Sequence, residues 1–86
     1  MQSITVFETS WCPYCKRARE YMDELLKEYP KYANINLNLV DEEVERELAN
    51  QYDYYYVPTF YIGDDKQYEG VVTKEIIQTI FDKAII

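Results

Sequence analysis

Hydrophobic and polar positions alternate in the first stretch of the chain and then change to helical spacing. Ile4 and Val6 lie on one face of residues 3–8, and Thr5 and Phe7 lie on the other, which predicts a strand. From Pro13 onward, apolar residues recur at the spacing of one helical face: Tyr14, Ala18, Tyr21, Met22, Leu25, Leu26 and Tyr29. Pro30 stops this pattern, so we expect a helix of about four turns.

In the middle of the chain, the pattern again changes from strand-like alternation to helical spacing, over shorter segments. Residues 34–40 alternate and predict a second strand. Asp41 is placed to cap a short acidic helix, with Glu42 and Glu43 in its first turn. Its narrow apolar stripe would consist of Val44, Leu48 and Tyr52.

The last third of the chain predicts a hairpin and a helix. Residues 59–62 form a third strand, turn at Gly63-Asp64-Asp65, and pair with a fourth strand at residues 66–69. We expect this turn to be longer than the tightest hairpin types. Thr73 is placed to cap a final helix with an apolar face of Ile76, Ile77, Ile80, Phe81, Ala84 and Ile85.

These elements occur in the order β-α-β-α-β-β-α, which indicates a single α/β domain over residues 1–86. The first strand, helix and second strand are expected to form a right-handed parallel crossover.

Composition narrows the classes of function. A chain of 86 residues with a net charge of -7 is unsuited to binding nucleic acid or an anionic membrane through bulk electrostatics. The first residues lack a basic region followed by an apolar run, and no stretch is apolar enough to span a bilayer. We therefore expect a cytoplasmic protein, which acts as a monomer.

The only two cysteines, Cys12 and Cys15, are separated by two residues. A disulfide in so small a loop closes and opens at little entropic cost, which suits a redox pair. Pro13 favours the first helical position, which makes Cys12 the N-cap residue and places Cys15 in the first turn. The helix dipole, together with Lys16, Arg17 and Arg19, should lower the pKa of Cys12. Cys12 is thus the expected attacking thiolate and Cys15 the resolving thiol.

Other uses of the cysteine pair remain open at this stage. The pair could form a small structural disulfide. With no histidine and no second cysteine pair, a tetrahedral zinc site would need ligands from two chains. A non-catalytic dimer that binds a metal or an iron–sulfur cluster through Cys12 is the corresponding alternative to an enzyme. We expect no bound metal or other cofactor.

The motif Cys12-Pro13-Tyr14-Cys15, preceded by a strand and opening a helix, resembles the site of dithiol glutaredoxins. Val57-Pro58 and Gly70 before the last helix extend the resemblance over nearly the whole chain. The resemblance implies a thioredoxin-like fold, with a four-stranded mixed sheet flanked by three helices. It also implies a cis peptide bond between Val57 and Pro58. The substrate groove would then consist of Trp11, Pro13, Tyr14, Val57, Pro58 and Gly70.

The chain departs from glutaredoxins where that family holds glutathione. The lysine common before the first cysteine is replaced by the stretch 8–11, Glu-Thr-Ser-Trp. The paired glycine and acidic residue before the last helix are replaced by residues 69–73, Glu-Gly-Val-Val-Thr. Trp11 beside Cys12 is similar to thioredoxins, although Val6 stands where thioredoxins carry a buried acid.

Several neighbours of the cysteines have two possible roles. Trp11 and Tyr14 could contact a partner peptide, but Tyr14 also begins the apolar stripe of the first helix. At least two of Tyr54, Tyr55 and Tyr56 are expected to pack in the core or along an edge strand. The three basic residues after Cys15 could pair with acids along their helix, and we expect Lys16 and Arg17 to be solvated.

The sequence therefore predicts a thiol-disulfide oxidoreductase that reduces protein or glutathione mixed disulfides through Cys12 and Cys15. Its electrons would come from glutathione or from thioredoxin reductase. The second of these donors would make it a thioredoxin-type electron donor, for example to one dedicated enzyme.

Overall fold

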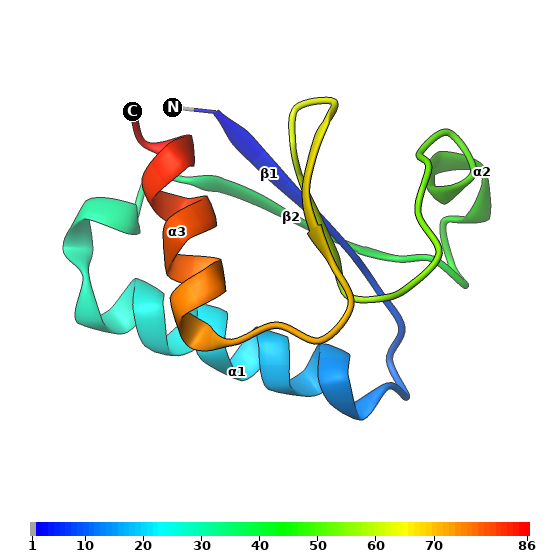
Figure 1. Ribbon diagram of the computed structural model, residues 1–86, viewed down its shortest axis with the longest axis horizontal. Helices are drawn as coiled ribbons and strands as arrows, with labels where there is room; N and C mark the ends of the chain where they lie inside the picture. Colours follow the sequence, from blue (N-terminus) through cyan, green and yellow to red (C-terminus); the bar gives the residue numbers. More distant parts are fainter. Residues whose placement is uncertain (1) are drawn as a thin grey trace.

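The computed structural model describes residues 2–86 (Figure 1). Its strands are β1 (Ser3–Glu8), β2 (Asn36–Asp41), β3 (Thr59–Ile62) and β4 (Asp65–Glu69). Its α-helices are α1 (Pro13–Glu28), α2 (Arg46–Ala49) and α3 (Lys74–Ala84), and a short 3₁₀ helix covers Pro30–Tyr32. The predicted element order is thus confirmed.

The four strands form one mixed sheet in the order β2-β1-β3-β4. β1 runs parallel to β2 along its whole length, from Ser3 opposite Asn36 to Glu8 opposite Asp41. β3 is antiparallel to both β1 and β4. α1 supplies the crossover between the two parallel strands, as expected for a strand-helix-strand unit.

Alternation along β1 divides the core into two parts. Ile4 and Val6 face α1 and α3 and join a large buried cluster with Phe60 and Phe81. Phe7 faces the other way and packs in a smaller cluster with Val40, Ala49 and Tyr61. α2 lies apart from the other two helices, on the side of this second cluster (Figure 1). The expected four-stranded mixed sheet flanked by three helices is therefore confirmed.

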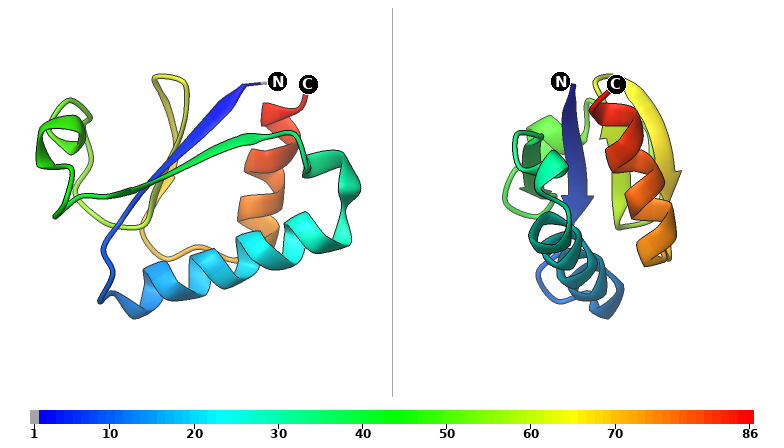
Figure 2. Two further views of the ribbon diagram at one scale, coloured as in Figure 1. Left: turned by 180° about the vertical axis from the view of Figure 1, so that it is seen from behind. Right: turned by 90° about the vertical axis from the view of Figure 1, so that its left-hand side faces the viewer.

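The third helix is fixed at its start and along one side. Thr73 caps α3, because its side-chain oxygen accepts a hydrogen bond from the backbone N–H of Ile76 at 3.2 Å. Lys74 forms ion pairs with Glu24 and Glu28 of α1, at 2.9 Å and 2.6 Å. Figure 2 shows the start of β1 beside the C-terminal end of α3, and the N–H of Gln2 donates to the carbonyl of Ala84.

The boundaries around β2 differ from those predicted. β2 begins at Asn36 rather than at residue 34, and it includes Asp41, which was expected to cap a helix. Pairing with Glu8 draws Asp41 into the sheet, and its carboxylate instead accepts a hydrogen bond from the N–H of Glu43. α2 therefore starts only at Arg46, and Val44, expected in its apolar stripe, is 79% exposed.

The hairpin turn was also predicted incorrectly. Ile62 pairs directly with Asp65, so only Gly63 and Asp64 form the loop. Gly63 has a φ of +58°, which only glycine adopts readily, and this matches the first position of a tight type II′ turn. The pairing of β3 with β4 shifts register after Phe60, which leaves Gln67 of β4 as an irregularity in the ladder.

Candidate active site

The strand topology brings four chain segments together at one end of the sheet. The parallel strands β1 and β2 both end there, at Glu8 and Asp41. Thr59, the first residue of β3, lies opposite Phe7 of β1 and Glu69 of β4. The loops that follow or precede these positions contain the cysteines, Pro58 and Gly70, so all predicted groove residues lie on segments that meet at this end.

The start of α1 places the two sulfurs in different surroundings. Cys12 is the N-cap residue, with an extended backbone (φ -78°, ψ 121°), and Pro13 follows as the first helical residue. Both thiols are free. Cys12 is 8% exposed and Cys15 is fully buried within the first turn. The predicted N-cap arrangement is confirmed.

The pKa of Cys12 is lowered from the ordinary value of a thiol. Burial by itself raises this pKa, but the backbone and thiol of Cys15, the backbone of Tyr14 and the side chain of Thr9 outweigh it by hydrogen bonding to the thiolate. Tyr14 and Cys15 lie in the first turn, where backbone N–H groups have no partner within the helix. The helix start therefore favours the thiolate.

The pKa of Cys15 moves the opposite way, to about 11. Burial is the largest cause, and the thiol of Cys12 and the charges of Cys12 and Glu8 add to it, while the backbone of Thr9 opposes it. At neutral pH, Cys15 is consequently a protonated thiol next to a cysteine that ionises readily.

The cations after Cys15 contribute less to this site than the sequence suggested. Arg19 forms an ion pair with Glu8 at 2.9 Å, and the Glu8 side chain is only 12% exposed. Burial raises the pKa of Glu8, although Arg19 opposes this shift. Lys16 and Arg17 are exposed, as predicted. The predicted lowering of the Cys12 pKa is thus confirmed in direction, but hydrogen-bond donors rather than these side chains account for it.

The loop before β3 is held by β4. The Val57–Pro58 peptide bond is cis, which confirms the expectation from the resemblance. The carbonyl of Pro58 accepts a hydrogen bond from the N–H of Gly70 at 2.9 Å, and Gly70 has a φ of +98° that favours glycine. The Glu69 carboxylate accepts hydrogen bonds from the N–H groups of Tyr55 and Tyr56.

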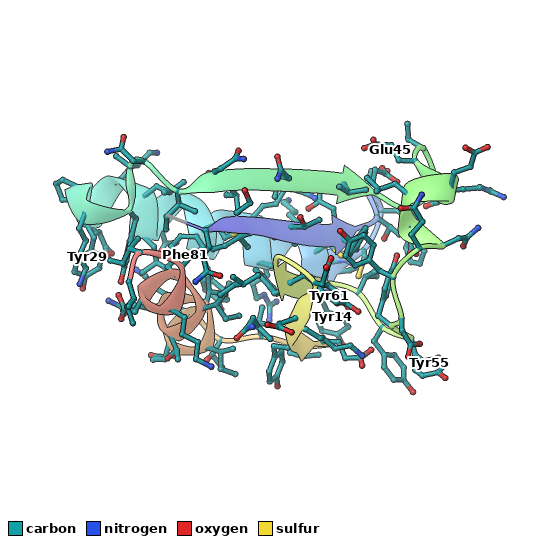
Figure 3. All side chains as sticks on the ribbon, turned by 90° about the horizontal axis from the view of Figure 1, so that it is seen from above. Tyr14, Tyr29, Glu45, Tyr55, Tyr61 and Phe81 are labelled. Atoms are coloured by element: carbon teal, nitrogen blue, oxygen red, sulfur yellow. The ribbon has the colours of Figure 1, made fainter. Side chains whose placement is uncertain are left out.

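Aromatic side chains around the cysteines divide into packed and exposed groups. Trp11 is 71% exposed, and its indole N–H donates to Glu43 at 2.5 Å. Tyr14 is half-exposed. Tyr54 stacks on Phe7, whereas Tyr55 and Tyr56 are largely exposed, so the prediction that at least two of these three tyrosines pack is wrong. Figure 3 shows Tyr55 pointing away from the fold at the end opposite Tyr29.

A polar hollow of about 320 Å³ lies between α2 and the loop that contains Tyr54 and Tyr55. Its lining consists of Glu42, Glu43, Arg46, Ala49, Asn50, Tyr52, Tyr54 and Tyr55. Tyr54 donates a hydrogen bond to Glu42 at 2.7 Å, which ties the loop to the end of β2. Within residues 2–86, no three side chains of the types His, Cys, Asp or Glu gather closely enough to hold a metal ion.

Three residues of this site were not identified from the sequence: Thr9, Glu43 and Glu69. Thr9 is buried beside both cysteines, Glu43 holds Trp11, and Glu69 holds the loop before Pro58. Glu43 and Glu69 are far from their partners along the chain, so no local pattern could have revealed them.

Comparison with known proteins agrees with this geometry. The family model for glutaredoxin matches residues 4–66, which is more than half of the chain. The chain belongs to the glutaredoxin family. It is a glutaredoxin-type redox protein of the thioredoxin-like superfamily, with its cysteine pair at the start of α1.

Two similar relatives carry the name of thioredoxin. A probable thioredoxin of Methanothermobacter thermautotrophicus is 34% identical over 73 residues, which cover 85% of this chain and 84% of the relative. A thioredoxin of Methanocaldococcus jannaschii is 28% identical over 82 residues, or 95% of this chain and 94% of the relative.

Solved structures confirm the fold of this glutaredoxin-type protein. The oxidised thioredoxin of Plasmodium falciparum superposes with a TM-score of 0.75 at 22% identity, over 98% of this chain and 81% of that one. Mitochondrial thioredoxin 3 of Saccharomyces cerevisiae gives a TM-score of 0.71 at 20% identity, over 95% and 77%. The predicted thioredoxin-like fold is therefore confirmed. In the described part of the chain, no helix has both the length and the apolar character needed to cross a membrane.

Proposed function

We propose that this protein reduces protein disulfides by dithiol exchange, with Cys12 as the nucleophile and Cys15 as the resolving thiol. The observation that carries the proposal is the opposite shift of the two pKa values at the start of α1. A nucleophilic thiol must be ionised, and the lowered pKa of Cys12 increases the fraction of the thiolate at a given pH. The buried Cys15 stays protonated until a mixed disulfide forms above it.

The reaction consists of two exchanges. The Cys12 thiolate attacks one sulfur of the substrate disulfide, whose S–S bond breaks, and the other substrate sulfur leaves as a thiolate that takes up a proton. Cys15 then loses its proton and attacks the Cys12 sulfur, which releases the second substrate thiol. The substrate has gained two electrons and two protons, and Cys12 and Cys15 are left as a disulfide.

We further propose protein disulfides as the substrate class and thioredoxin reductase as the electron donor. The segment before Cys12 offers no cation for a glutathione carboxylate, because residues 8–11 are Glu, Thr, Ser and Trp. The nearby Arg19 is already paired with Glu8. Glu42 and Glu43, which follow β2, add negative charge at the same end of the sheet. Glutathione carries two carboxylates, so these charges disfavour it relative to a neutral or basic peptide.

A trapping experiment tests the dithiol mechanism. Cys12→Ser should lose reduction of a disulfide-bonded test protein, whereas Cys15→Ser should accumulate a covalent complex with that protein, visible on a non-reducing gel. Cys12→Ser provides the matched control, because it keeps one cysteine of the pair but lacks the nucleophile. Full multiple turnover by Cys15→Ser on protein disulfides would contradict the mechanism.

A rate comparison tests the donor. The oxidised protein is mixed either with glutathione and its reductase or with thioredoxin reductase and NADPH, and reduction of the Cys12–Cys15 disulfide is followed in both. We expect faster reduction by thioredoxin reductase. Faster reduction by glutathione would contradict this assignment and leave the dithiol mechanism intact.

A further inference from the structure

The two edges of the sheet differ in how they are protected against further strands. β4 forms one edge and carries Asp65, Lys66 and Glu69. Its pairing with β3 is also irregular at Gln67, and charges and irregularities of this kind hinder strand addition. β2 forms the other edge, which Figure 3 shows with no strand beyond it, and it pairs with β1 in one continuous register. Residues 34–40 contain no charged residue, proline or glycine, so the β2 edge is open to a further strand.

The backbone groups that β2 offers at this edge belong to two leucines. The N–H of Glu42, directly after β2, donates to the carbonyl of Glu8, and the register of the two strands is regular up to this point. Backbone groups of successive strand residues point to opposite sides, so Asn38 also bonds toward β1, whereas Leu37 and Leu39 point outward. Within residues 2–86, no strand, loop or side chain supplies a partner for the outward N–H and carbonyl groups of these two leucines.

The side chains at this edge form an apolar surface with balanced charges. Leu37 and Leu39 lie opposite two β1 residues of the main core, Ile4 and Val6, and therefore share the face of the sheet that packs against α1. Leu39 is 45% exposed. Both leucines line an open hollow of about 400 Å³, whose charged lining comes from α1: Lys16, Arg19, Glu20 and Asp23. Two cations and two carboxylates balance there, although the whole chain carries a charge of -7, so a second copy is not repelled from this surface.

We propose that two copies of this chain pair through β2, antiparallel to each other about a two-fold axis at Asn38, and so form one continuous sheet. In this register Leu37 of one copy lies opposite Leu39 of the other, and the two residues exchange N–H···O=C hydrogen bonds. Every free backbone group of the two leucines is then paired. The leucines also cover each other on the face of α1, while the two Asn38 side chains meet on the opposite face.

A second copy suits this edge because the edge complements itself. A two-fold interface places the same patch on both sides, so its groups must match under that symmetry. The outward backbone groups of Leu37 and Leu39 match in this way, and the hollow brings both signs of charge toward the axis. The cysteine sites of the two copies lie at opposite ends of the shared sheet, since β2 ends at the site and the two β2 strands run in opposite directions. The dimer differs from the monomer expected from the sequence, and it does not depend on the proposed redox function.

Sedimentation velocity of the reduced protein over a range of micromolar concentrations tests self-association. A reductant in the buffer excludes dimers that are linked through Cys12. We expect a reversible dimer, and Leu39→Lys should weaken it by roughly tenfold or more, because it places a charge on the open edge. Val44→Lys is the matched control, since it changes another exposed aliphatic residue in the same way but outside β2, and it should leave dimerisation unchanged. A natural protein that stays monomeric at all concentrations, or equal weakening by both variants, would overturn the proposal.

Charges at Asn38 test the symmetry of the pair without changing either leucine. Asn38 is exposed, so we expect both Asn38→Asp and Asn38→Lys to fold. Each variant alone places two like charges directly opposite each other across the axis, and should be monomeric at concentrations where the natural protein is dimeric. An equal mixture of the two variants should regain dimers, because the facing charges are then opposite. A mixture that stays monomeric, or single variants that dimerise like the natural protein, would refute a two-fold axis at Asn38.

Hydrogen exchange identifies the backbone groups that form the ladder. The amide protons of Leu37 and Leu39 should become several-fold better protected as the protein concentration rises, whereas the amide of Asn38 already bonds to β1 and should change little. Reduction of a disulfide-bonded test protein should proceed at the same rate per chain in the natural protein and in Asn38→Asp, so failure of the redox proposal stays distinct from failure of this one. Concentration-dependent protection confined to residues outside β2 would mean that dimers form through another surface, which would contradict the proposal.

Discussion

Tyr32 is a single side chain that connects the 3₁₀ helix to α3. It is fully buried, its ring meets Phe81 edge to face, and its hydroxyl donates to the Asp82 carboxylate at 2.5 Å. The ring fills space in the main core while the hydroxyl reaches a partly exposed charge. This one residue thus combines apolar burial with a polar link over 50 positions of sequence.

Removing the hydroxyl measures that link. Tyr32→Phe keeps the ring but loses a hydrogen bond to a charged group, and we expect it to lower the free energy of unfolding by about 1–3 kcal/mol. Urea unfolding followed by circular dichroism gives this value, with an unchanged m value if the fold is retained. Tyr29→Phe is the control, because Tyr29 is 37% exposed, and its effect should stay within about 0.5 kcal/mol. Equal losses in the two variants would show that the hydroxyl of Tyr32 contributes nothing specific.

At this scale, the sequence predicted the roles of Cys12 and Cys15 because the helix start is a local feature. Pro13 and the apolar spacing after it define the N-cap without reference to the rest of the chain. Tyr32 could not be identified in this way, since its partners lie on α3. The same applies to Tyr55 and Tyr56, whose backbone N–H groups donate hydrogen bonds to Glu69 of β4.

Among the elements, β4 organises the loop that leads into β3. Glu69 at its end accepts hydrogen bonds from the N–H groups of Tyr55 and Tyr56 and pairs with Lys66 at 2.7 Å. These contacts lower the pKa of Glu69 to about 2, with the hydrogen bond from Lys66 as the largest cause. An ionised Glu69 therefore stabilises the loop above its ordinary pKa of 4.5, and this stabilisation decreases as the pH falls toward 2.

Substitution of Glu69 should loosen the loop without unfolding the sheet. In Glu69→Gln the acceptor is neutral, so we expect several-fold lower protection of the Tyr55 and Tyr56 amides from hydrogen exchange. Amides in the centre of β1 should keep their protection. Glu75→Gln is a matched control on α3, where the carboxylate is exposed. Unchanged protection at Tyr55 and Tyr56 would contradict the role of Glu69.

The helices α1 and α3, whose apolar residues recur at regular helical spacing, were predicted well. The bounds of α2, which depend on pairing between β1 and β2, were not. α1 and α3 each have an apolar face that specifies them locally. The short α2 was expected to start at Asp41, a good N-cap residue, but the ladder with β1 extends the strand through that position. A hydrogen-bonded pair with a neighbouring strand thus outweighed a local capping preference.

In the molecule as a whole, acidic residues lie both at the end of the sheet that contains the cysteines and at the opposite end. The net charge is -7, and Glu42 and Glu43 follow β2 at the end that contains the cysteines. Asp64, in the β3–β4 turn, lies at the opposite end of the sheet. The two ends therefore offer acidic residues that differ mainly in their distance from Cys12.

This distribution predicts a preference for basic substrates. Two disulfide-linked peptides that differ only in flanking Arg or Glu residues should be reduced at different rates, with the Arg peptide faster at low salt and the difference smaller at high salt. Glu43→Gln should decrease the preference roughly two- to fivefold, as expected for one exposed charge pair. Asp64→Asn changes the same charge at the far end and should leave the preference unaltered. Equal decreases in both variants would mean that only net charge matters.

The overall topology was predictable because the order of elements and the crossover rule leave few arrangements. Which segments of the chain meet at the cysteine site was harder to predict from the sequence. The stretches 9–12, 42–43, 55–58 and 69–71 meet only because β1, β2 and β4 run in one direction and end there, while β3 runs in the opposite direction and begins there.

The hydrogen bond between Gln2 and Ala84 lies at the end of β1 remote from Cys12, and the N–H of Gly63 donates to the carbonyl of Ser3 at that same end. A solid support or a fused domain attached at either end of this chain would therefore extend away from the reactive sulfur. The protein immobilised in this way, on a bead or an electrode, would keep Cys12 turned toward the surrounding solution and open to large substrates.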